Sequence, residues 1–138
     1  MRNIHNLERQ HIDIIGLISN IKTGINSSDV DKNLDILVRD INILAGKLNI
    51  HMTSEDKFLY PTLIESKDEE LKEIAKEYSN EMGSIYTEFN DYKNNFNTKS
   101  KVLRDIDKFL KESYEIVKVL EKRISKEDRY LYPKIKSV

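Results

Sequence analysis

The chain has no cysteine, only two prolines and four glycines, and no apolar run of membrane-spanning length. The absence of cysteine excludes disulfides, thiolate metal sites and cysteine nucleophiles, and it is compatible with a reducing cytosol. The first residues lack the apolar core of a signal peptide. We therefore expect a cytoplasmic protein that does not interact with membranes.

An excess of charge of either sign is also missing, because 23 basic side chains stand against 24 acidic ones. Without a basic patch, we expect no nucleic-acid partner. There is no glycine-rich phosphate loop, and no serine lies in a recognisable Ser-His-Asp context. What is present is 138 residues, enough for one domain with a proper core.

Apolar residues at three-and-four spacing predict four long helices, over about 3–23, 29–64, 68–95 and 101–132. Ser27, Ser28 and Asp29 are the N-cap candidates for the second helix. Long helices with short connections favour an antiparallel up-down four-helix bundle. We predict an all-α fold with a single domain over residues 1–138.

One seven-residue segment occurs twice. Glu-Asp-Lys-Phe-Leu-Tyr-Pro at 55–61 recurs 72 residues later as Glu-Asp-Arg-Tyr-Leu-Tyr-Pro at 127–133. The two segments contain both prolines of the chain, so we predict that each copy closes a long helix at a matching place. Two similar hairpins that face each other would bring Glu55 and Glu127 to one depth of the bundle.

Several polar residues interrupt the apolar stripes of the predicted helices: His11, His51, Glu55 and Glu127, with Glu81 at the border of a stripe. Burying ionised carboxylates without partners costs several kcal/mol each. The compensating cations can be protons, arginine or lysine side chains, or metal ions. A pair of metal ions answers the requirement most completely, because iron accepts both imidazole and carboxylate ligands.

These segments resemble the hemerythrin-like family of four-helix di-iron proteins, also called the HHE cation-binding domain. The resemblance covers essentially the whole chain, and it rests on these pieces: Arg9-Gln10-His11, His51 to Asp56, Glu81-Met82-Gly83, Arg123 to Asp128, and the two Leu-Tyr-Pro stops. It implies two iron ions joined by an oxo or hydroxo bridge and by two carboxylates, with histidines at the remaining positions. His11, His51, Glu55 and Glu127 match family ligands.

Two positions depart from the family pattern. Glu81 stands where a third-helix histidine is usual, and Arg123 stands where a fourth-helix histidine is usual. Arginine has no lone pair to offer, so Arg123 either turns toward the site as a cation or points outward into solvent. Tyr78 and Glu77 are possible substitutes for the missing donor. The predicted metal ligands are His11, His51, Glu55, Glu81 and Glu127.

Three other residues are assigned roles outside the chemistry of the site. We expect Tyr60 and Tyr132 to pack the end of the bundle and to orient the Tyr-Pro segments. His5 lies six residues before His11 and off the ligand face, so we expect it to be exposed.

The resemblance implies a small ligand, such as O2, H2O2 or NO, at an open coordination position. A third carboxylate in place of imidazole would lower the reduction potential, which argues against reversible oxygen carriage and for sensing, scavenging or stress response. One alternative is a dedicated peroxide-decomposing or oxidase enzyme. Another is a metal-free or zinc-holding helical module that binds a protein partner, whose identity stays open. The choice between iron and manganese stays open as well.

Overall fold

The computed structural model describes the backbone of residues 2–137 and the side chains of residues 4–137, and this part of the chain contains no strand. The helices are α1 Arg2–Ile25, α2 Leu34–Ser54, α3 Tyr60–Ile64, α4 Glu69–Phe96, α5 Lys99–Leu103, α6 Ile106–Lys126 and α7 Tyr132–Lys136. A 3-10 turn, Val30–Asn33, precedes α2. Two π-helical turns, Glu55–Leu59 and Glu127–Leu131, join α2 to α3 and α6 to α7.

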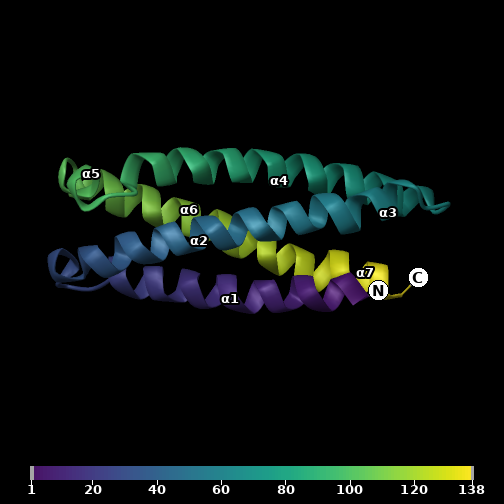
Figure 1. Cartoon of the computed structure of the whole chain (residues 1–138), viewed down its shortest axis with the longest axis horizontal. Coiled ribbons are helices and arrows are strands. Elements are labelled where there is room, and N and C mark those ends of the chain that lie inside the picture. The colour runs from purple at the N-terminus through teal and green to yellow at the C-terminus, as the bar shows by residue number, and fades with distance from the viewer. Residues whose placement is uncertain (1, 138) are drawn as a thin grey trace.

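The four long helices form an antiparallel bundle (Figure 1). Helix α1 packs against α2 and α6, and α4 packs against the same two helices. Both ends of the chain lie at the end of the bundle where α7 is found (Figure 1). The all-α four-helix bundle predicted from the sequence is confirmed.

Helix starts agree with the prediction at one place and differ at two. Asp68 caps α4, since its carboxylate accepts the backbone N–H groups two and three residues on. The region from 27 to 29 does not cap α2; the Ser27 hydroxyl accepts the N–H of Asp29 in a turn instead. The predicted fourth helix is divided, because Asp105 interrupts it and caps α6 through the N–H of Lys108.

Both repeated segments lie near the end of a helix at matching places, because the helical residues stop at Ile64 and, 72 residues later, at Lys136. The first end agrees with the prediction, and the second lies a turn beyond the predicted one. In each copy the tyrosine N–H bonds to the carbonyl of the glutamate five residues earlier, which makes a π-helical turn. Pro61 and Pro133 then fall in the first turn of α3 and α7, where a helix needs no N–H donor. The chain therefore stays helical for a further turn past each proline.

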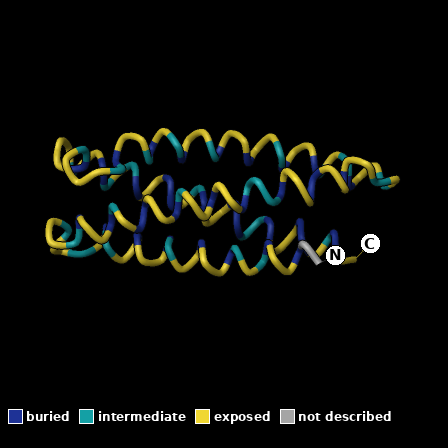
Figure 2. Tube along the Cα trace, in the orientation of Figure 1, coloured by how far each residue is buried: buried dark blue, intermediate teal, exposed yellow. Residues whose placement is uncertain are grey.

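The interior has two apolar clusters with a polar layer between them. The larger cluster extends toward α5 and includes Leu44, Phe89 and Phe109. The smaller lies around α3 and α7 and includes Leu59 and Leu131. Along each helix the buried residues follow the inner face (Figure 2). The layer between the clusters consists of five buried polar side chains: His11, His51, Glu55, Arg123 and Glu127.

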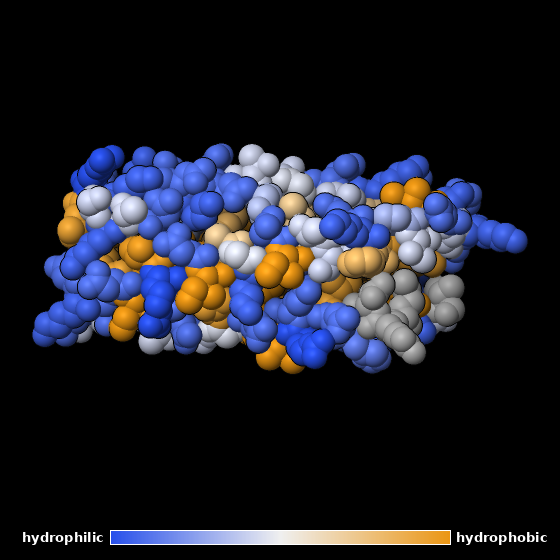
Figure 3. Space-filling model, viewed as in Figure 1, coloured by the Kyte–Doolittle hydropathy of each residue, from blue (hydrophilic) through white to orange (hydrophobic). Residues whose placement is uncertain are grey.

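The surface is mostly polar, with apolar side chains in separate groups on the face shown in Figure 3. The large exposed apolar residues include Ile12, Ile36, Ile43 and Ile50. No helix in the described part of the chain combines the length and the apolarity that crossing a membrane requires.

Candidate metal centre

Four of the five predicted ligands meet in the polar layer. Helix α1 supplies His11 and α2 supplies His51, while the two π-helical turns supply Glu55 and Glu127. Their exposed fractions are 1%, 2%, 0% and 1% respectively, so all four are withdrawn from bulk water. A π-helical turn often marks a functional position in a helix, and here each one begins at an inward carboxylate.

The donor atoms lie at the spacing expected around one metal ion. His11 Nε2 is 3.0 Å from His51 Nε2 and 2.8 Å from Glu127 Oε1. His51 Nε2 is 3.2 Å from the same Glu127 oxygen and 3.2 Å from Glu55 Oε1. Two ligand atoms bound to one ion at about 2.1 Å and at a right angle are about 3.0 Å apart. The residues therefore fit a shared cation.

The outer nitrogens of the two imidazoles are held in the orientation that a metal ligand needs. His11 Nδ1 lies 2.7 Å from Asp128 Oδ1, and His51 Nδ1 lies 2.8 Å from Gln10 Oε1. Because both oxygens are acceptors, each Nδ1 can carry a hydrogen, which leaves each Nε2 to give its lone pair to a metal ion or to take up a proton when no ion is bound. Metal-bound histidines commonly have such an acceptor behind them.

One oxygen of the centre is weakly compensated. Within the described residues, Glu55 Oε1 is buried and makes no well-aligned hydrogen bond, although His51 Nε2 lies 3.2 Å from it. Burial, with the charge of Glu127 beside it, raises the pKa of Glu55 to about 8. Burial lowers the pKa of His51, but hydrogen bonds and charges from Glu127 and Glu55 outweigh it and raise that pKa to about 9. Protons or a cation must therefore neutralise this layer.

The two oxygens of Glu127 face different side chains. Oε1 contacts the two imidazoles, and Oε2 accepts a hydrogen bond of 3.1 Å from Arg123 Nη2. Burial raises the pKa of Glu127, yet hydrogen bonds from His11 and His51 and the charge of Arg123 hold it well below its usual range. Arg123 is itself 2% exposed, so the inward alternative for this residue is the one that the structure adopts.

Glu81 does not join the other four predicted ligands. Its side chain is 42% exposed and pairs with Arg123 Nη1 at 3.3 Å and with Lys126 Nζ at 3.0 Å. Burial raises the pKa of Glu81, but these two cations outweigh it and lower that pKa. The neighbouring Met82, 3% exposed, occupies the inward position on α4. Glu81 thus lies on the outer side of Arg123, away from the two imidazoles.

Tyr78 and Glu77, the possible substitutes for the missing histidine, do not lie among the candidate ligands. The Tyr78 ring packs on the guanidinium of Arg123, whose Cζ lies 4.8 Å from the ring centroid. Glu77 is exposed on α4. His5 is exposed as well, with 81% of its side chain accessible.

Sequence reasoning missed the contacts that the two repeat tyrosines make with the centre. Both are buried, as expected, but the Tyr132 hydroxyl lies 3.2 Å from His11 Nε2 and donates to Glu55 Oε2 at 3.4 Å. The Tyr60 hydroxyl accepts from Arg123 Nη2 at 2.8 Å. Burial raises the pKa of both phenols, so both stay neutral. Their recurrence five residues after each inward glutamate was the signal that could have found them.

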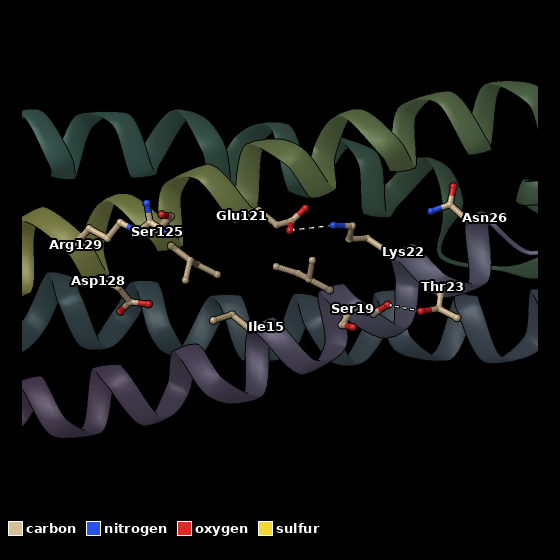
Figure 4. Close-up of a pocket in the computed structure, with 11 residues that line it drawn as sticks. Ile15, Ser19, Lys22, Thr23, Asn26, Glu121, Ser125, Asp128 and Arg129 are labelled. Carbon is tan, nitrogen blue, oxygen red and sulfur yellow. Dashed lines mark hydrogen bonds and ion pairs between the residues drawn. The ribbon is translucent and has the colours of Figure 1, made fainter.

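Sequence reasoning also missed the partners of the histidines. Gln10 precedes His11 directly, and Asp128 follows Glu127 in the repeated Glu-Asp pair. Asp128 also lines a groove between α1 on one side and α6 with the π-helical turn that follows it on the other, and Ile15 of α1 lines it as well (Figure 4). This groove reaches the residue that holds the outer nitrogen of His11.

A four-helix bundle with two imidazoles and two carboxylates in a buried layer defines a class of protein that can hold a cation in its core. The family model of the hemerythrin HHE cation binding domain matches residues 2–135. The chain belongs to this family. A search of curated proteins gave no match, and neither did a search of solved structures.

Proposed function

We propose that the protein binds iron through His11, His51, Glu55 and Glu127 and uses it to bind or react with O2, H2O2 or NO. The observation that carries the proposal is the convergence of the Nε2 atoms of two imidazoles with carboxylate oxygens, at 2.8 to 3.2 Å, in a buried layer between two apolar clusters. Bound iron supplies an open coordination position and redox chemistry.

The surrounding residues favour a ligand of only a few atoms. The donors are at most 2% exposed, and apolar clusters close the layer on both sides, so a large substrate would have to separate the helices. The Tyr132 hydroxyl, 3.5 Å from Glu127 Oε1, can donate a hydrogen bond to a small ligand that carries negative charge. Asp128 is among the residues that line the groove in Figure 4, and we infer that a small ligand approaches the centre from this groove.

The type of reaction has to come from turnover measurements. The expectation against oxygen carriage used Glu81 as a third carboxylate ligand, and the structure places that side chain outside the centre. Two inward carboxylates remain, which fit a binder or sensor as well as a peroxide-consuming enzyme. Peroxide turnover measured beside reversible oxygen uptake separates these functions.

Metal content tests the proposal directly. Protein from iron-supplied cells should contain iron by mass spectrometry and should absorb in the near ultraviolet. His51→Ala should lower iron affinity at least about tenfold, because it removes an inward donor. His5→Ala is the matched control, since it deletes an exposed imidazole and should leave the iron content unchanged. Folded wild-type protein without iron, or with zinc alone, would refute the proposal and favour the interaction module.

A further inference from the structure

We propose that the centre holds one metal ion, not the pair that the family resemblance implies, and that the guanidinium of Arg123 takes the place of the second cation. The inference rests on the proposed function, since it specifies the occupancy of the same site. It follows from the different surroundings of the two oxygens of Glu127.

All imidazole donors lie on one side of Glu127. The chain has three histidines, and the third of them, His5, is exposed at the surface. A nitrogen of His11, a nitrogen of His51 and an oxygen of Glu127 lie within 4.8 Å of one another. Two histidines and one carboxylate are a donor set that holds a single non-haem ferrous ion. These residues leave no imidazole for a second ion.

On the other side of Glu127 a permanent cation is already in place. Arg123 Nη2 donates to Glu127 Oε2 at 3.1 Å and to the Tyr60 hydroxyl at 2.8 Å, while Nη1 reaches Glu81 at 3.3 Å. The ring of Tyr78 covers the guanidinium face. Arginine stays protonated at any accessible pH and has no lone pair, so it cannot give way to an ion by releasing a proton.

Charge balance in the layer also favours one ion. Within the layer, Glu55 and Glu127 are the two buried carboxylates and Arg123 is the one arginine. With Arg123 present, one divalent ion leaves the layer with a single excess positive charge, whereas two divalent ions would leave three before any anion binds. Excess charge of one sign is costly in a region so far removed from water. Arg123 therefore limits the layer to one metal ion.

Counting ions tests the inference and separates its failure from that of the proposed function. Protein loaded anaerobically with excess ferrous iron and passed through a desalting column should retain one ion per chain. After oxidation it should give the paramagnetic resonance signal of an isolated high-spin ferric ion. Two ions per chain with a silent, coupled resonance would overturn the inference and leave the proposed function standing. No bound iron would refute the proposed function itself.

Two substitutions test the role of Arg123. Arg123→His removes the fixed charge and adds a lone pair, so it should raise the count from one ion to two. Arg123→Met removes the charge at similar volume and should tighten binding of the first ion by at least about tenfold, since a buried like charge is lost. Circular dichroism checks the fold of each variant. If Arg123→His does not fold, the affinity of Arg123→Met for the first metal ion tests the inference instead.

Lys122→Met removes a cation at an exposed neighbouring position and is the matched control. It should change neither the number of ions bound nor the affinity for the first ion. One ion in folded Arg123→His, or an unchanged affinity in Arg123→Met, would show that the arginine does not act as the second cation.

Discussion

The metal-free protein should lose stability as the pH rises from about 6.5 to about 8. Burial raises the pKa of Glu55 from 4.5 to about 8. The two carboxylates raise the pKa of His51 from 6.5 to about 9, against the effect of burial. Between pH 6.5 and about pH 8, Glu55 and His51 each keep a proton in the folded state and release it in the unfolded chain. Because the folded state binds more protons, the free energy of unfolding falls with increasing pH.

The two pKa shifts give the size of the effect. Each proton held only by the folded state contributes about 1.4 kcal/mol per pH unit, so two protons give a loss of about 3 to 4 kcal/mol across this interval. Between pH 4.5 and 6.5 Glu55 alone contributes, and the slope should be about half as steep. The effect of Glu127 on stability has the opposite sign. Its pKa is lowered in the folded state, so the stability that it contributes is lost as the pH falls below 4.5.

Urea unfolding of chelator-treated protein, followed by circular dichroism from about pH 5.5 to about pH 8.5, measures this slope. Glu55→Gln is a matched variant, because its neutral amide takes up no proton and should roughly halve the slope. Bound metal replaces the protons, so metal affinity should rise with pH over the same range. A free energy of unfolding that stays level or rises between about pH 6.5 and about pH 8 in the metal-free protein would contradict the reasoning.

Two further predictions concern single side chains. Asp128→Ala removes the acceptor at His11 Nδ1 and should weaken metal binding by about 10- to 100-fold in a competition titration. Asp56 is the exposed residue at the matching position of the other copy of the repeat, so Asp56→Ala should leave metal affinity unchanged. Equal losses of affinity in the two variants would argue against the role of Asp128. Leu44→Ala should destabilise the bundle by about 2 to 5 kcal/mol in urea unfolding, against about 0.5 kcal/mol or less for the exposed neighbour Ile43→Ala. Similar costs at the two positions would contradict the packing of α2.

Helical periodicity was sufficient to predict the bundle, because each long helix carries a stripe of buried residues on one face. The π-helical turns could not be predicted in this way. They insert an extra residue into a turn without changing the local composition, and only the recurrence of the segment marks them. Their effect is to carry each helix past its proline, which local rules place at a helix end.

The structure brings together the predicted ligands that interrupt an apolar stripe, and it leaves out the one at the edge of a stripe, where two neighbouring residues compete for the inward position. His51 and Glu55 lie four residues apart on one face, so both turn inward together. Glu81 and Met82 differ by about 100° around the helix axis, and the sequence does not decide which of them faces the core. The apolar Met82 takes that position, and Glu81 pairs with Arg123 and Lys126 instead.

The inward turn of Arg123 has a physical cause that a single sequence hides. Glu55 and Glu127 occupy matching places in the repeat, and each has a residue four positions earlier on the same helix face, His51 and Arg123 respectively. A buried carboxylate requires a cation at that position. The imidazole meets this requirement only with a proton or a metal ion, whereas the guanidinium always meets it. In this chain, therefore, the half of the centre that contains His51 needs a proton or a metal ion, and the half that contains Arg123 carries its own permanent charge.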